Sequence, residues 1–211
     1  MIPLILRLKK GAHKDVAIAQ DLIMQEATGI FNEGVLHGGT AIWRCYNGNR
    51  FSEDIDMYIK KDLERINLFF KNLERSGFAI SKKKIGDNSI YSELIWNRTS
   101  VRFEAIFKKA NGSLKEYETA EGTYLTVYTL TPAELIIEKI DAYVKRLKVR
   151  DLYDIFFLLR YVEDINKIKN NLRILIKEFK KPIDEKTLKI LIIEGLTPAT
   201  DKMKDYIRQS I

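Results

Sequence analysis

Residues 37–60 read HGGTAIWRCYNGNRFSEDIDMYIK, in which a glycine pair precedes two acids that stand one residue apart. The apolar run before the glycines predicts a short buried strand, TAIWRCY predicts the start of a helix, and IDMYIK predicts a second strand. Alternate side chains of a strand share a face, so Asp54 and Asp56 should project together, about 7 Å apart at their Cα atoms. The fold prediction therefore starts from this order of elements: a strand, a glycine turn, a helix and an acidic strand.

The two acids predict a cation site. Carboxylates held this close repel each other unless a cation lies between them. Oxygen ligands of this kind suit Mg²⁺, which usually also binds substrate phosphates. Gly38 and Gly39 allow the backbone to approach a ligand, the helix start offers N–H groups, and Thr40 adds a hydroxyl. Either motif alone is commonly a plain turn or a solvated strand edge, whereas together they indicate phosphoryl or nucleotidyl transfer.

The same residues closely resemble the GGTAL…RFSxDIDL signature of the AbiEii nucleotidyltransferase toxins, which belong to the DNA polymerase β-like superfamily. The resemblance is tight over residues 37–58 and looser to residue 160, and we find none in the last fifty residues. It implies an α+β chain, with the polymerase β-like nucleotidyltransferase fold (a twisted mixed sheet with flanking helices) followed by a C-terminal helical half. We accordingly expect a nucleotidyltransferase core over 1–130 and a helical domain over 131–211.

The resemblance also assigns roles to individual residues. It implies that Gly39 and Thr40 contact substrate phosphate, and that Asp54 and Asp56 bind Mg²⁺ or Mn²⁺. Two further residues, Arg50 and Ser52, fall in the family's R-F-S segment and are predicted to bind the nucleotide. The alternative for Ser52 is a cap of the turn.

A third acid is expected from a neighbouring strand, where the superfamily places a metal ligand that can help to activate the attacking hydroxyl. In SVRFEAIF, alternation puts Arg102, Glu104 and Ile106 on one face. Glu104 is therefore the best candidate, although many relatives carry Asp at this position. The alternative is a surface pair between Arg102 and Glu104.

The helical half contributes a lysine and two acids. Lys139 in ELIIEKIDAYVKR has apolar and aromatic neighbours at helical spacing, so it needs a route to solvent or an anionic partner. The resemblance implies that this lysine contacts the nucleotide triphosphate. In VRDLYDIFFLL, Asp151 and Asp154 match an R-D-x-x-D signature, and we favour Asp151 as the residue that positions Lys139 or substrate. Alternatively, Asp151 caps the helix and Asp154 pairs with Arg150.

Other elements follow from periodicity and capping residues. Helices are predicted over 13–28, stopping at Gly29, and over 62–77, starting at Asp62. Three strand-like stretches follow, and a β-rich segment extends to about residue 130. Thr131, Pro132 and Glu134 predict a capped helix start. A second apolar helix and two or three amphipathic helices complete the prediction, with breaks near Pro182, Gly195 and Pro198.

Composition bounds the remaining possibilities. Of 211 residues, 45% are hydrophobic, so we expect a folded chain, and no run approaches the roughly 20 apolar residues of a membrane helix. The single cysteine, Cys45, and the order of the N-terminal residues favour the cytoplasm and argue against a secretory signal. The net charge of +7 suits a polyanionic partner such as RNA, or simply a solvated surface.

The functional expectation is a metal-dependent nucleotidyltransferase that moves an NMP from an NTP to an acceptor hydroxyl. By resemblance it is a toxin of a type IV toxin–antitoxin or abortive-infection system, with tRNA or another RNA as acceptor and a cognate antitoxin encoded nearby. Two alternatives remain open at this point. One is transfer to a protein or a small molecule, and the other is a non-catalytic nucleic-acid-binding module with the same fold.

Overall fold

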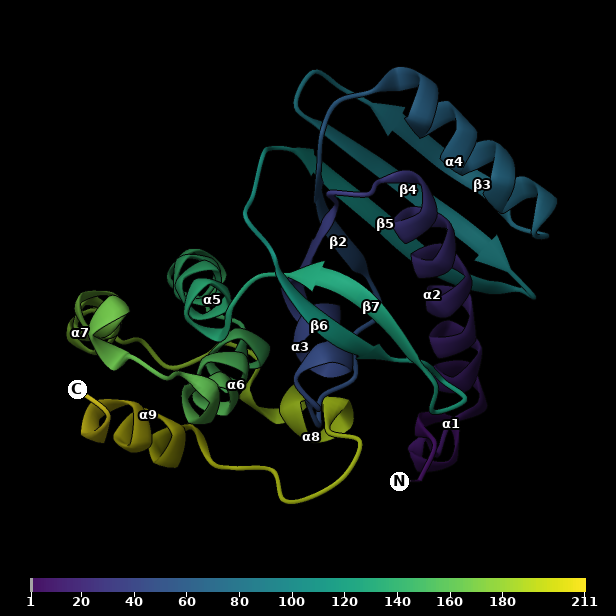
Figure 1. Cartoon of the computed structure of the whole chain (residues 1–211). Helices are drawn as coiled ribbons and strands as arrows, with labels where there is room; N and C mark the ends of the chain where they lie inside the picture. The colour runs from purple at the N-terminus through teal and green to yellow at the C-terminus, as the bar shows by residue number, and fades with distance from the viewer. Residues whose placement is uncertain (1) are drawn as a thin grey trace. The chain divides into compact units, whose positions relative to one another are not determined.

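A computed structural model describes residues 2–211 (Figure 1). The chain folds into two compact units. The N-terminal unit comprises the chain up to Asn47 together with Phe51–Thr129. The C-terminal unit comprises Leu130–Ile211 together with the short segment Gly48–Arg50. No helix within residues 2–211 combines the length and the apolar character needed to cross a membrane.

A seven-stranded mixed sheet forms the N-terminal unit, in the order β3-β4-β5-β2-β1-β7-β6. Its strands are β1 (Val35–His37), β2 (Ile55–Ile59), β3 (Ala79–Ile85), β4 (Ser89–Trp96), β5 (Thr99–Phe107), β6 (Ser113–Glu118) and β7 (Tyr124–Thr129). The acidic strand β2 is central: it runs antiparallel to β1 and parallel to β5. The predicted strand, turn, helix and strand order of residues 35–59 is therefore confirmed.

Four helices belong to this unit: α1 (Leu4–Arg7), α2 (Gly11–Ile30), α3 (Gly38–Cys45) and α4 (Leu63–Arg75). Helices α2 and α4 lie together against one face of the sheet (Figure 1). The core between them contains Phe69 of α4 and Phe103 of β5, whose ring centroids are 4.7 Å apart. Since alternate residues of β5 are buried, Arg102 and Glu104 are half-buried on the opposite face.

Helix boundaries test the capping predictions. Asp62 caps α4 by accepting from the N–H groups of Glu64 and Arg65, as expected. The prediction that Gly29 ends α2 is wrong, because the helix runs to Ile30. The helix ends without a glycine, through a bond from the Phe31 N–H to the Ala27 carbonyl, 2.8 Å.

The C-terminal unit is helical. Its α-helices are α5 (Pro132–Arg146), α6 (Val149–Leu158), α7 (Lys169–Lys177), α8 (Leu188–Leu191) and α9 (Thr200–Gln209), with 3₁₀ turns at Leu159–Tyr161, Ile165–Lys167 and Glu185–Thr187. The predicted capping box at Thr131 and Glu134 is present. Helix α5 packs against α6 and α7, and α9 packs against the same two helices. The strand-like segment at Arg50 joins the unit by pairing with Ile192.

Candidate active site

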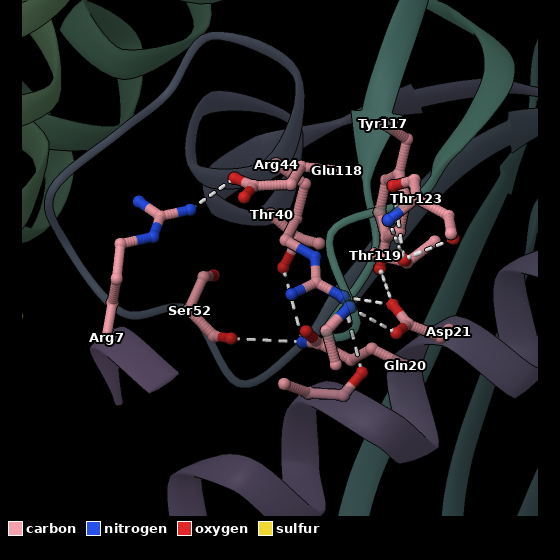
Figure 2. A network of polar contacts seen from close by, with 12 residues as sticks. Arg7, Gln20, Asp21, Thr40, Arg44, Ser52, Tyr117, Glu118, Thr119 and Thr123 are labelled. Carbon is pink, nitrogen blue, oxygen red and sulfur yellow. Dashed lines mark hydrogen bonds and ion pairs between the residues drawn. The ribbon is translucent and has the colours of Figure 1, made fainter. Parts of the chain in front are cut away.

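A buried hydroxyl joins the glycine turn to the acidic strand. The Thr40 side chain is fully buried, and its Oγ1 donates to the carbonyl of Asp54 and accepts from the Gln20 amide at 3.4 Å. The same Gln20 amide donates to the Ser52 carbonyl at 3.0 Å (Figure 2). Thr40 was predicted to present its hydroxyl to phosphate. In the structure the hydroxyl bonds instead to the chain segment that carries Asp54.

Gln20 has no place among the predicted site residues, although its sequence context carried a signal. It lies on α2 between Ala19 and Ile23, and all three side chains are fully buried. A buried amide in such surroundings must find hydrogen-bond partners, because an unpaired one is costly. Gln20 and Thr40 therefore hold the Ser52–Asp54 segment in place.

We expect Thr40→Val to destabilise the N-terminal unit by about 1–3 kcal/mol and to slow nucleotide transfer. Valine keeps the volume but leaves the Asp54 carbonyl without its hydroxyl donor. Urea denaturation and a transfer assay would measure the two effects. Thr40→Ser, which retains the hydroxyl, serves as the control, and an equal loss in both variants would argue against this role.

Gly38 brings the turn into contact with Asp56. Its φ is +71°, and a Cβ added to it would lie 2.3 Å from Asp56 Oδ2. Both the left-handed backbone and the close carboxylate require glycine here. The space that was expected to admit a ligand is therefore lined by the carboxylate itself, while Gly39 is buried in the first turn of α3.

Three carboxylates gather around β2 and β5. Asp56 is paired in register with Glu104, and Asp54 immediately precedes β2. Arg102 holds Asp54 through two bonds, from Nε to Oδ1 at 2.8 Å and from Nη2 to Oδ2, and its Nη1 lies 3.8 Å from Glu104 Oε1. Burial and the charges of Asp56 and Asp54 raise the pKa of Glu104, while Arg102 opposes this rise. The charges of the three acids and of Arg102 therefore act on one another.

The fit of this cluster to a divalent ion depends on Arg102. Across residues 2–211, no three His, Cys, Asp or Glu side chains are already arranged to hold a metal ion. Here Asp54 is oriented toward Arg102, whose guanidinium neutralises the acids as a cation would. The donor set consists of carboxylate oxygens, which are the ligands that Mg²⁺ and Mn²⁺ prefer. These residues fit such an ion if the ion replaces Arg102 as the partner of Asp54.

We expect Glu104→Gln to raise the midpoint of thermal unfolding in EDTA and to reduce the further rise that Mn²⁺ produces. Burial and repulsion from Asp56 and Asp54 raise the pKa of Glu104, and the substitution removes both the buried charge and this repulsion. That repulsion operates above the carboxyl pKa of the unfolded chain and disappears as the pH falls through the raised folded pKa. The gain should therefore be present at pH 7 and absent in acid.

Scanning calorimetry at the two pH values, with and without MnCl₂, would measure this change. Glu116→Gln removes the same charge from an exposed position on β6 and is the control. A full Mn²⁺ response in Glu104→Gln would contradict the metal-ligand role of Glu104.

A second buried network of polar contacts connects α3 to its neighbours. Arg44 is fully buried and donates to Asp21 (Figure 2). Its guanidinium lies 4.7 Å from the ring centroids of both Trp43 and Tyr117. Asp21 also accepts from the Tyr117 hydroxyl at 3.1 Å and from the Ala120 N–H at 2.6 Å. Arg44 is therefore a structural group of this unit, which ties α3 to α2 and β6.

The C-terminal unit contains its own charged cluster. Asp154 is fully buried and accepts from Arg50 Nε and Nη2, both at 2.8 Å, and Lys139 Nζ lies 3.0 Å from it. Lys139 is also 3.8 Å from Asp151, which pairs with Arg146 through two 2.7 Å bonds. Burial alone would raise the pKa of Asp154, but Arg50 and Lys139 outweigh it and lower the pKa.

This cluster identifies the partners that the sequence left open. Lys139 has anionic partners, and the closer of the two is Asp154. Arg50, predicted to bind the nucleotide, uses its guanidinium to hold Asp154. Helix α6 begins after Lys148, and its first N–H, that of Val149, donates to Asp184 and not to Asp151, so Asp151 does not act as its cap. Gly38, Thr40, Ser52 and the three carboxylates belong to the N-terminal unit, whereas Arg50, Lys139 and Asp151 belong to the C-terminal unit.

Comparison with known proteins gives one family and several structural neighbours. A family model described as "Nucleotidyl transferase AbiEii toxin, Type IV TA system" matches residues 23–209, well beyond the segment whose motifs showed the resemblance. No curated protein sequence matched the chain.

Several solved structures share the fold, and three of them are the following. MenT4, a nucleotidyltransferase toxin from Mycobacterium tuberculosis H37Rv, aligns with a TM-score of 0.66 at 19% identity, covering 95% of this chain and 84% of MenT4. JHP933 from Helicobacter pylori aligns with a TM-score of 0.62 at 18% identity, covering 92% and 89%. The antibiotic-resistance factor ANT(2'')-Ia aligns at 0.51 with 16% identity, covering 77% and 92%. These neighbours confirm the predicted nucleotidyltransferase fold.

Proposed function

The chain belongs to the AbiEii family of nucleotidyltransferase toxins of type IV toxin–antitoxin systems, and we propose that it transfers an NMP from an NTP to a hydroxyl of an RNA acceptor. One observation carries the proposal: Asp56 packs against the Gly38 turn and lies in register with Glu104, with Asp54 beside them. Acids beside a glycine turn on a rigid sheet suit a reaction that depends on positioning and charge stabilisation.

In this mechanism Asp54, Asp56 and Glu104 are the residues that would hold Mg²⁺ or Mn²⁺. A bound ion would supply Lewis-acid stabilisation of the negative charge on the phosphates. The acceptor oxygen forms a bond to the α-phosphorus, the bond between the α- and β-phosphates breaks, and pyrophosphate leaves. Glu104, which lies in register with Asp56, receives the proton of the acceptor hydroxyl.

The remaining residues bind and position. We assign Gly38, Gly39 and Ser52 to binding of the triphosphate. Thr40 holds the chain segment that carries Asp54, through its hydrogen bond to the Asp54 carbonyl. Lys139 neutralises charge on the departing pyrophosphate. Asp154 and Asp151 orient its ammonium group, and Arg50 holds Asp154 in place. Since Asp154 is closer to Lys139 and bonds Arg50 with both oxygens, we assign it the larger positioning role.

RNA is the acceptor that the charge favours, with a tRNA 3′ end as the leading candidate within the family. The chain carries 36 basic and 29 acidic residues, and phosphates attract such an excess at long range. Modification of tRNA would arrest translation, which would account for the toxicity that the family description implies. A cognate antitoxin is expected from the family, and in type IV systems it need not touch the toxin.

A labelling experiment tests this function. The purified protein receives each α-³²P-labelled NTP with Mg²⁺, and total RNA and total protein are offered separately. Label on RNA, lost when Mg²⁺ is chelated, is the expected result. Label on protein alone would identify a protein-modifying nucleotidyltransferase and refute the RNA acceptor. No label under any condition, with RNA still bound, would favour a binding module.

A further inference from the structure

A basic cavity lies at one edge of the sheet of the N-terminal unit, where β2 and β5 end. Its volume is about 580 Å³, which is within the usual range of ligand pockets. We call it the lysine pocket and define it by Lys60, Lys61, Phe107, Lys108, Lys109 and Tyr128. Nothing in the proposed chemistry above uses these residues.

The parallel pairing of β2 and β5 creates this concentration of charge. Ile59 and Phe107 are paired in register as the last residues of their strands, and a lysine pair follows each of them. The Lys108 N–H donates to the Ile59 carbonyl at 3.1 Å, so the two strands leave the sheet side by side. Four lysines therefore line one cavity, where Glu33 is the acidic lining residue, and one of them, Lys61, also donates through Nζ to the Asp87 carbonyl at 3.1 Å.

Aromatic rings accompany the lysines. Lys61 Nζ lies 5.5 Å from the Phe107 ring centroid, and Lys108 Nζ lies 4.7 Å from that of Tyr58. Tyr128 retains 38% of its surface exposed. Lysines beside an accessible ring such as that of Tyr128 suit single-stranded nucleic acid, since lysines contact the phosphates and a ring stacks on a base.

The pocket shares a sheet face with the carboxylates. Tyr58 follows Asp56 by two residues on β2, and Lys108, the residue directly after β5, follows Glu104 by four. The contact of Lys108 with the Tyr58 ring confirms that both project from that face. At about 3.3 Å per residue, Lys108 begins about 13 Å from Glu104. A chain-like ligand of a few nucleotides can therefore span the distance from the acids to the pocket.

We propose that the lysine pocket binds the sugar–phosphate backbone of the single-stranded RNA acceptor, a few nucleotides from the hydroxyl that reacts. This rests on the proposed function, in which RNA is the acceptor. The lysines contact phosphates irrespective of sequence, and Tyr128 offers its ring to a base.

The test is RNA binding by a double variant, Lys60→Gln with Lys109→Gln, in the full-length chain. These two lysines are chosen because Lys61 and Lys108 also contact aromatic rings of the protein. The control, Lys71→Gln with Lys84→Gln, removes the same charge from exposed positions on α4 and β3. The probe is a fluorescent single-stranded RNA oligonucleotide, and anisotropy is recorded over a range of salt concentrations.

We expect the pocket variant to bind more weakly at every salt concentration. Its plot of log affinity against log salt should be shallower by about 1.4, because each phosphate contact on a single strand contributes about 0.7 to the slope. The control should retain the wild-type slope. In the transfer assay, the pocket variant should raise the KM for RNA more than it lowers kcat.

A wild-type slope in the pocket variant, equal losses in the two variants, or a wild-type protein that binds no RNA would each overturn the pocket assignment. Failure of the proposed function has a different signature. If RNA binds in a lysine-dependent manner but never acquires label, RNA is not the acceptor and the pocket remains an RNA site. If RNA acquires label while the pocket variant binds like the control, the pocket assignment alone is refuted.

Discussion

Asp56→Asn is expected to reduce transfer of label to the acceptor by at least about a thousandfold while the protein remains folded. Loss of one charged metal ligand removes several kcal/mol of charge stabilisation, and about 4 kcal/mol corresponds to a thousandfold change in rate. Asparagine has nearly the same shape, so it fits the space beside Gly38 that Asp56 fills.

Three measurements on the same preparation would establish the effect. Circular dichroism and the midpoint of thermal unfolding report the fold, the labelling assay reports transfer, and growth on induction reports toxicity. Asp141→Asn, at an exposed position on α5, removes the same charge and should leave all three unchanged. Substantial transfer by a folded Asp56→Asn protein would rule out the carboxylate site.

Asp154→Asn is expected to lower the free energy of unfolding of the C-terminal unit by about 3–5 kcal/mol. The substitution leaves the Arg50 guanidinium and the Lys139 ammonium buried without their shared countercharge, and such a broken buried pair is strongly destabilising. Arg50 is only 5% exposed and Lys139 8%, so neither can readily recover its loss from water.

The pH dependence has a defined sign. The pKa of Asp154 is lowered, so its stabilising contribution is present above the pKa of an unfolded Asp and is lost as the pH falls through the lower folded value. The wild type and Asp154→Asn should therefore differ most at neutral pH and converge in acid.

Urea denaturation at several pH values would measure this contribution. Asp151→Asn should cost less, because its partner Arg146 has 43% of its side chain exposed and can be solvated. Asp205→Asn, at an exposed position on α9, should change the stability by no more than about 0.5 kcal/mol. Equal losses for Asp154→Asn and Asp205→Asn would contradict the role of the buried cluster.

Local sequence patterns predicted the elements that position the site. The glycine pair before an acidic alternating run predicted β1, α3 and β2, and alternation in SVRFEAIF placed Glu104 opposite the buried face of β5. Capping chemistry at Thr131 and Asp62 placed the starts of α5 and α4. These features depend on residues a few positions apart, so a single sequence contains them.

Long-range pairings could not be predicted in this way. Arg50 and Asp154 are 104 residues apart, and Arg102 and Asp54 are 48 apart, so no periodicity connects them. The Thr40 hydroxyl points inward because it donates to the backbone carbonyl of Asp54, 14 residues further along the chain. Each of these groups is polar, and its role depends on its hydrogen-bond partner. The fold determines that partner, and the residue type alone does not specify it.

The carboxylate site is tested most directly by a crystal structure with Mn²⁺ and a non-hydrolysable NTP, located by anomalous scattering. The predicted result is an anomalous peak within bonding distance of the Asp54 and Asp56 carboxylates, with Arg102 moved away from Asp54. A nucleotide complex in which Mn²⁺ binds elsewhere and Arg102 still holds Asp54 would contradict the assignment.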